Sequence, residues 1–291
     1  MASSAKTTAI FYYSEPMSIY PSLEYYIVNN HSDTPTVLLV HGFSATAHQV
    51  WVETGWVKRL ISENFRLVLV RLPFHGSEFE KTPYIAEHAQ SLSSVETQKG
   101  AIDLPDENFL KALTSALHLL IEKLKTPVHM VGFSAGSRVS QAFAQAYPHD
   151  VKTLILAGLS PFDHYQPLQK YLAQYDGDSE ALPPGLNPMF LPLIKNSPVD
   201  LRGLRGFVDA MEDVEIHDAH GSRSAHPTLV VVGTEDHIAG DGHWLIKQLE
   251  QAGVPHRLQL LKNRDHINSL TSGVFKKAVI GWVKEYEGKN H

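Results

Sequence analysis

Short apolar runs rich in β-branched residues alternate with longer amphipathic stretches along most of this 291-residue chain. Runs of the first kind predict buried strands, and stretches with apolar residues every three or four positions predict helices. We expect eight strands, over Thr8–Tyr13, Leu23–Asn29, Thr36–His41, Phe65–Leu72, Val128–Phe133, Thr153–Gly158, Thr228–Gly233 and His256–Leu261. We expect helices over Val50–Glu63, Asp106–Lys125, Ala135–Tyr147, Gly242–Gln251 and Val274–Glu287. This alternation predicts an α/β fold, with a mostly parallel eight-stranded sheet, helices on both faces and an early antiparallel edge.

Two stretches depart from the alternation. Residues Glu78–Leu104 form a polar excursion, that is, a mostly polar segment after the fourth expected strand, and we expect no strand in it. Residues Pro161–Pro227 separate two expected strands by far more than a short crossover. Long inserts in compact domains are usually lids or binding loops. We therefore expect residues 161–227 to form a small helical cap over a core made of residues 1–160 and 228–291.

Composition narrows the class of protein. Apolar residues make up 43% of the chain and charged residues 19%, which suits a large buried core. The net charge of −6 argues against nucleic-acid binding. With no cysteine, the chain has no disulfide, thiol nucleophile or cysteine-ligated metal. We expect a cytoplasmic protein with no signal peptide and no membrane span, and the sequence carries no indication of its oligomeric state.

The stretch "GFSAGS" places Ser134 at the corner between an expected strand and an expected helix. A nucleophile on such a corner needs small neighbours, and Gly132 and Gly136 supply them. The alternative is a glycine-rich turn in which Ser134 has no catalytic role. The GxSxG spacing is loose by itself, so the strand before it and the amphipathic helix after it decide in favour of a nucleophile.

A serine hydroxyl needs a base, and the base needs an orienting group. Asp236 follows the expected strand Thr228–Gly233, and His266 follows the last strand, so both lie at carboxyl ends, where open α/β sheets place their sites. Four other candidates for the acid or base positions stay open, less favoured: Glu235, His237, Asp163 and Asp265.

The chain resembles the α/β-hydrolase-fold serine hydrolases. The resemblance rests on "HGF" (41–43), "GFSAGS" (132–137), "GTED" (233–236) and "DHIN" (265–268) and spans about residues 36–287. It implies Ser134 as nucleophile, His266 as general base and acid, and Asp236 as the acid that orients His266. It also implies an oxyanion hole made by the backbone N–H groups of Phe43 and Ala135, with no cofactor.

Other polar residues near these motifs receive structural interpretations. His41 is expected to brace the oxyanion loop by hydrogen bonding. In "RLPFHGSE" the chain has Arg71 where the family commonly has aspartate, and His75 is also expected to be structural. The fragment "HDAH" holds His217 and His220, but a third metal ligand at ordered spacing is missing, so a solvated loop is favoured and no metal is expected.

The expected cap offers apolar side chains for a substrate. Leu186, Met189 and Phe190 from the cap, with Phe43 and Phe133 from the core, are candidate substrate-binding residues, although packing of the cap is an equal alternative. By family resemblance the partners are a small ester-type or thioester substrate and water. Other reactions on the same residues remain alternatives, namely C–C bond hydrolysis, lactone hydrolysis, perhydrolysis and acyl transfer, and so does a catalytically silent ligand-binding protein.

Overall fold

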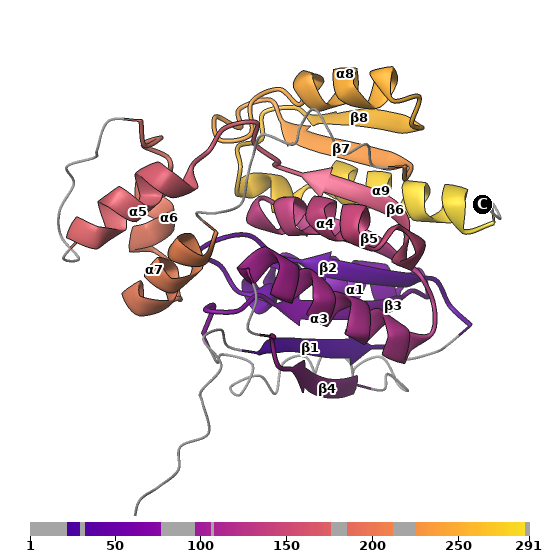
Figure 1. Ribbon diagram of the computed structural model, residues 1–291. Coiled ribbons are helices and arrows are strands. Elements are labelled where there is room, and N and C mark those ends of the chain that lie inside the picture. The colour runs from indigo at the N-terminus through magenta and orange to yellow at the C-terminus, as the bar shows by residue number, and fades with distance from the viewer. Residues whose placement is uncertain are drawn as a thin grey trace, which may run out of the picture.

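The computed structural model describes residues 22–29, 33–76, 97–105, 108–175, 185–211 and 225–288. Its centre is an eight-stranded sheet in the order β4-β1-β3-β2-β5-β6-β7-β8 (Figure 1). The strands are β1 (Leu23–Val28), β2 (Thr36–Val40), β3 (Arg66–Arg71), β4 (Thr97–Ile102), β5 (Val128–Phe133), β6 (Val151–Ala157), β7 (Thr228–Gly233) and β8 (His256–Leu261). The predicted fold class is confirmed.

Most of the sheet is parallel, and β1 is the strand that runs against both of its neighbours, β3 and β4. The central strands β2, β5 and β7 are buried at every position, as expected for parallel strands covered on both faces. These continuous apolar runs are the reason that the sequence pattern located them within one or two residues.

The edge strand β4 was not expected, because it lies in the stretch predicted to be a polar excursion. Its sequence, TQKGAI, has little apolar character, and its strand conformation comes from antiparallel pairing with β1 in the register Leu23↔Ile102. That prediction was wrong. The predicted strand Thr8–Tyr13 lies outside the described residues.

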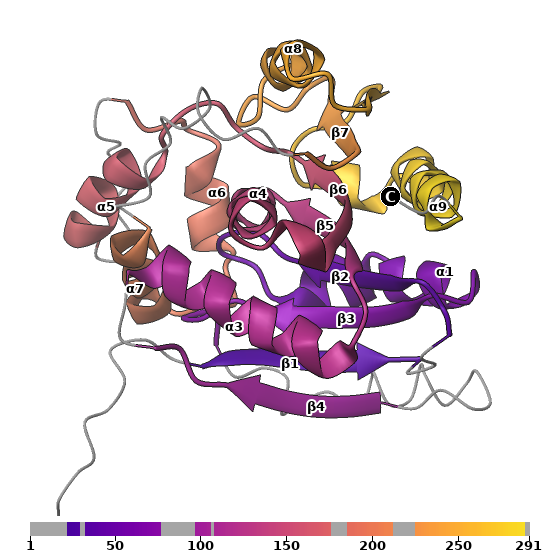
Figure 2. The ribbon, with the colours of Figure 1, turned by 45° about the vertical axis from the view of Figure 1, so that its right-hand side comes forward.

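Helices cover both faces of the sheet, as predicted (Figure 2). One hydrophobic cluster packs α3 (Phe109–Leu124), α4 (Ala135–Ala146) and α8 (His243–Gln251) on one face. A second cluster packs α1 (Trp56–Ile61) and α9 (Gly273–Glu287) on the other face.

The helix predicted over Val50–Glu63 is divided in the structure. A π-helical segment, His48–Glu53, precedes α1, and Gly55 between them has a φ of +79°. A left-handed residue of this kind interrupts a right-handed helix, and glycine adopts it at little cost.

Between β6 and β7, the described residues form helices α5 (Tyr165–Gln174), α6 (Phe190–Lys195) and α7 (Leu201–Ala210). They lie beyond the carboxyl ends of the parallel strands, to the left of the sheet in Figure 1. The division into a core and a cap at residues 161 and 227 stays a prediction. Over the described ranges, no helix is both long enough and apolar enough to cross a membrane.

Candidate active site

Ser134 occupies a strained corner between β5 and α4. Its φ is +54° and its ψ is −119°, a combination that is costly for a residue with a side chain and typical of functional sites. Its N–H donates to the Ala157 carbonyl oxygen at 2.8 Å, which ties the corner to β6. A methyl group on Gly132 would lie 2.5 Å from the Gly136 carbonyl oxygen, and one on Gly136 would collide with the carbonyl oxygen of Val40. Glycine at both positions therefore allows the backbone of β5, the corner and α4 to approach this closely.

Asp236 and His266 are joined by a buried hydrogen bond. Oδ2 of Asp236 lies 2.8 Å from Nδ1 of His266, and the side chains are 1% and 3% exposed. The other carboxylate oxygen accepts from the N–H groups of Ile238 and Ala239, at 3.0 and 2.9 Å. Burial by itself raises the pKa of Asp236, but the hydrogen bond and charge of His266, with the two amides, outweigh it and lower that pKa below its usual value.

The alternative candidates are engaged elsewhere or face solvent. Glu235 and His237 are exposed, on either side of the buried Asp236. The carboxylate of Asp163 accepts from the N–H of Tyr165 at 2.8 Å. The carboxylate of Asp265 accepts from backbone N–H groups within its own loop. Of the acids considered from the sequence, Asp236 is the one that the structure brings to His266.

His41 braces the loop after β2. Its Nε2 accepts from the N–H of Leu72 at 3.0 Å, so its Nδ1 carries the proton that is donated to the Gly42 carbonyl oxygen at 2.8 Å. Burial, and then the nearby His75, hold the pKa of His41 well below its usual value. With both ring nitrogens occupied, His41 has no free nitrogen with which to act as a base.

Arg71 and His75 are also held in structural contacts. Arg71 forms an ion pair with Glu24, its cross-strand partner on β1, which accounts for a cation where the family commonly has aspartate. His75 donates from Nδ1 to the Pro73 carbonyl oxygen at 2.9 Å and lies edge-on to the ring of Phe207. Burial lowers the pKa of His75 to about 4.

The amides of Phe43 and Ala135 are near Ser134 and uncommitted. Ala135 begins α4, and the loop with Phe43 passes so close that a methyl group on Gly42 would lie 3.0 Å from Ser134 Cβ. Neither amide donates to another residue within the described ranges. Both are thus available to an acceptor beside Ser134.

A cavity of about 600 Å³ opens beside Ser134 and His266. Its lining is largely apolar and includes four of the five predicted substrate-binding residues: Phe43, Phe133, Met189 and Phe190. The fifth, Leu186, is 6% exposed and packs in the hydrophobic cluster with α3 and α4, so it does not line this cavity.

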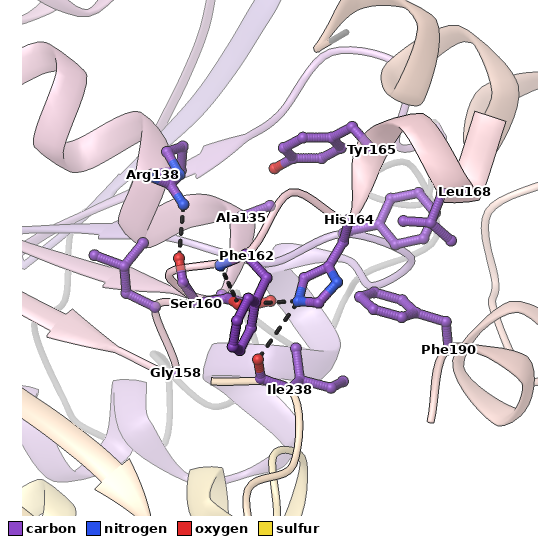
Figure 3. A pocket seen from close by; sticks show the side chains of 13 residues that line it. Ala135, Arg138, Gly158, Ser160, Phe162, His164, Tyr165, Leu168, Phe190 and Ile238 are labelled. Atoms are coloured by element: carbon purple, nitrogen blue, oxygen red, sulfur yellow. Dashed lines mark hydrogen bonds between the residues drawn. The ribbon is translucent and has the colours of Figure 1, made fainter. Parts of the chain in front are cut away.

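A second, smaller cavity with a volume of about 40 Å³ is also lined by Ser134, and Figure 3 shows the residues around it. Its walls carry Arg138, His164 and Tyr165, which sequence reasoning did not single out. The one available signal was Arg138, the single charged residue in the otherwise small or apolar start of α4. The fragment with His217 and His220, for which a solvated loop and no metal were expected, lies outside the described residues.

The comparisons with known proteins agree with this architecture. A family model described as "alpha/beta hydrolase fold" matches residues 35–188, just over half of the chain. The chain belongs to the alpha/beta-hydrolase fold family. The range matched by the family model includes the loop after β2 and the strand-to-helix corner at Ser134. Asp236 and His266 lie beyond the match, so their pairing rests on the structure.

Individual relatives of this alpha/beta-hydrolase include lipases and esterases. Human monoacylglycerol lipase ABHD6 is 30% identical over 125 residues, a match that spans 42% of this chain and 29% of that protein. A carboxylesterase structure from Nitrososphaera gargenis covers 94% of this chain and 97% of its own, with a TM-score of 0.63 and 16% identity. The monoacylglycerol lipase of Paleococcus ferrophilus covers 87% and 96%, with a TM-score of 0.56 and 19% identity. At these identities, the similarity to the two solved structures shows a shared fold.

Proposed function

We propose that the protein is a serine esterase that forms an acyl-enzyme on Ser134. The observation that carries the proposal is the buried Asp236–His266 hydrogen bond on the cavity that Ser134 also lines. A nucleophile on a strained corner, a histidine base and a carboxylate that orients the base are the three groups that acyl transfer needs.

The chemistry follows from the position of each group. Nε2 of His266 takes the proton of Ser134 Oγ as that oxygen attacks the ester carbonyl carbon. The N–H groups of Phe43 and Ala135 stabilise the resulting oxyanion, and such a donor is worth about 3 kcal/mol in the transition state. Collapse expels the alcohol, which takes the proton from His266. Water then repeats the sequence, releases the acid and restores Ser134.

The Asp236 carboxylate supports this cycle by holding His266 in one tautomer. Because Nδ1–H of His266 donates to Oδ2, the lone pair of the ring lies on Nε2, as a base toward Ser134 requires. The carboxylate stays ionised at neutral pH, since its pKa is lowered, and it therefore stabilises the imidazolium that forms during attack.

The proposed substrates are esters with a medium-sized apolar group. A volume of about 600 Å³ is within the range of small-molecule sites, and the lining favours an apolar chain. The names of the relatives, monoacylglycerol lipase and carboxylesterase, support the same ester class. The helices between β6 and β7 would then act as the predicted cap, since Met189 and Phe190 line the cavity. A cytoplasmic location is compatible with the absence of cysteine.

The test is hydrolysis of a series of p-nitrophenyl esters from acetate to decanoate. The wild type is expected to hydrolyse the series, and Ser134→Ala to lose at least about a thousandfold in kcat with its fold intact by circular dichroism. Ser62→Ala, a serine on the surface beyond α1, is the matched control and retains full activity. If wild type and Ser134→Ala are equally inactive on every ester, the protein is a ligand-binding homologue and the proposal fails.

A further inference from the structure

Two cavities of different size adjoin Ser134. Both have largely apolar linings, but the small one also carries a guanidinium, an imidazole and a phenol. Both are lined by Ser134, Phe43, Phe190 and Ile238, so they are neighbours at one proposed reacting centre. An ester bound with its carbonyl at Ser134 can therefore extend one arm into each cavity.

Arg138 is the most distinctive group in the small cavity, which we call the Arg138 pocket (Arg138, Ser160, His164 and Tyr165). It lies one helical turn beyond Ser134 on α4, and its Nη2 donates to the Ser160 carbonyl oxygen at 2.7 Å (Figure 3). Within the described part of the chain its guanidinium makes no other hydrogen bond, and no carboxylate oxygen lies within 4 Å of the guanidinium nitrogens. A guanidinium has five N–H donors, so most of them remain without a protein acceptor.

This cation is partly desolvated, and within the described residues it forms no direct ion pair with the nearby Asp163. Burial lowers the pKa of Arg138, with a smaller opposing effect of Tyr165 and Asp163. The carboxylate of Asp163 is exposed and already bound to the N–H of Tyr165. An anion that pairs directly with this guanidinium would offset the desolvation of its charge.

Tyr165 and His164 complete the polar wall. The hydroxyl of Tyr165 has no hydrogen-bond partner among the residues described and points to the side of the pocket where Arg138 lies (Figure 3). Burial raises the pKa of Tyr165 to about 12, so this hydroxyl remains a donor at neutral pH. Nε2 of His164 is fixed 2.9 Å from Ser160 Oγ, and its ring packs 5.0 Å from that of Phe190.

The size of the pocket limits what it can hold. Its volume of about 40 Å³ corresponds to roughly three water-sized positions. A carboxylate, with three heavy atoms, fits that space. Arginine binds a carboxylate through two parallel N–H···O bonds, and the Tyr165 hydroxyl can donate to the same group.

From this arrangement we propose that the Arg138 pocket binds a carboxylate on the short arm of the ester, while the apolar arm occupies the large cavity. The inference rests on the proposed esterase function and names its substrate class, an ester that joins an apolar group to a short carboxylate-bearing group. The carboxylate can belong to the acyl half, as in a dicarboxylic hemiester, or to the alcohol half, as in an acylated hydroxy acid. Arg138 would bind either carboxylate through the same hydrogen bonds. The experiment distinguishes a carboxylate on the acyl half from one on the alcohol half.

The experiment compares each carboxylate with its isosteric amide. For the acyl arm, the substrates are the monooctyl ester of malonic acid and the corresponding malonamic acid ester. For the alcohol arm, they are the octanoyl esters of glycolic acid and of glycolamide. The readout is the ratio of kcat/KM for the carboxylate to that for the amide, so a general loss of activity cancels. The wild type is expected to show a ratio of about ten to one hundred for one of the two pairs.

Variants assign this preference to the Arg138 pocket. Arg138→Met is expected to bring the ratio to about one, Arg138→Lys to leave it intermediate because the charge stays and the fork is lost, and Tyr165→Phe to lower it several-fold. Arg202→Met removes the same charge from an exposed position on α7 that lines neither cavity, and it keeps the wild-type ratio. Ratios of one or less for both pairs in the wild type, or a ratio that survives in Arg138→Met, would overturn the inference.

Binding without turnover separates this inference from the esterase proposal. Calorimetric titration of Ser134→Ala with octanoyl glycolate and with monooctyl malonate is expected to show tighter binding than the matching amides for one of the two pairs, again lost on adding Arg138→Met. If no ester is hydrolysed but this difference persists, the esterase proposal fails and the carboxylate pocket stands. Hydrolysis of neutral esters with equal binding of carboxylates and amides overturns the pocket alone.

Discussion

At the scale of single residues, hydrogen bonds fix the orientation of the side chains around Ser134. Asp236 is the clearest case, because its two carboxylate oxygens accept three hydrogen bonds, from the amides of Ile238 and Ala239 and from the ring of His266. The carboxylate thereby holds the histidine ring against the loop after β7. Its chemical contribution is to select the tautomer of His266.

Replacing Asp236 by asparagine tests that contribution. An amide nitrogen at the Oδ2 position cannot accept from His266 Nδ1–H, so the ring is expected to adopt the wrong tautomer. We expect kcat on p-nitrophenyl butyrate to fall about 10³- to 10⁴-fold, with a smaller change in KM. Glu235→Gln, at the exposed neighbouring position, serves as the control and retains activity. A loss of less than tenfold in Asp236→Asn would contradict the assigned role.

His75 gives a prediction for stability. Its pKa is about 4 in the folded protein, while an unfolded histidine titrates near 6.5. Above pH 6.5 the His75 ring is neutral in both the folded and the unfolded protein. Between pH 6.5 and 4 the ring binds a proton mainly in the unfolded protein. The free energy of unfolding therefore falls as the pH falls through this range. The expected loss attributable to His75 is about 3 kcal/mol of unfolding free energy at pH 4.

Urea unfolding at pH 7.5, 5.5 and 4.5, followed by tryptophan fluorescence, measures this dependence. His75→Asn keeps a donor toward the Pro73 carbonyl oxygen and removes the titrating ring. The variant should lose less stability between pH 7.5 and 4.5 than the wild type. Equal slopes for the two proteins would show that His75 titrates normally in the folded state.

The sequence pointed to candidate site residues through their order along the chain, and it missed the candidates that only packing brings to Ser134. Ser134, Asp236 and His266 follow strand ends, and a parallel sheet brings such ends to one edge. Arg138 and His164 have no such signature, because their importance depends on how the loop after β6 packs against α4.

At the scale of elements, apolar strands were predictable and polar ones were not. The buried strands β2, β5 and β7 follow from their continuous apolar runs, whereas β4 owes its conformation to its neighbour β1. In the same way, the break between the π-helical segment and α1 depends on the backbone of Gly55, which a hydrophobic pattern does not report. Pairing and backbone conformation are the parts that local sequence leaves open.

Helix α6 gives a prediction at this scale. Met189, which immediately precedes it, lines the large cavity and is 37% exposed, so a larger side chain can be accommodated there without disturbing the core. Met189→Trp is expected to shorten the usable cavity and lower kcat/KM for the decanoyl ester at least about tenfold relative to the acetyl ester.

The same p-nitrophenyl ester series measures this change in chain-length preference. Val274→Trp is a suitable control, because Val274 is also exposed and apolar but lines neither described cavity. An unchanged ratio of decanoyl to acetyl activity in Met189→Trp would show that the apolar arm of the substrate lies elsewhere.

At the scale of the whole molecule, the sheet collects separate segments at one edge. The loops after β2, β5, β7 and β8 supply Phe43, Ser134, Asp236 and His266, and the helices between β6 and β7 lie over that edge. Hydrophobic clusters on both faces hold the strands in register. The fold class and the mostly parallel sheet were predictable from the strand–helix alternation, whereas the strand order was not predicted. The two cavities depend on side-chain packing between distant segments and became visible only in the structure.

The central claim is that Ser134 is a nucleophile activated by His266 and Asp236. Mass spectrometry after treatment with a fluorophosphonate tests it most directly, since this reagent captures an activated serine without any assumption about the substrate. The account predicts one adduct per chain on the peptide that carries Ser134, no adduct in Ser134→Ala, and greatly slowed labelling in His266→Ala. Absence of an adduct on Ser134 in the folded wild type, or labelling of a different residue, would contradict it.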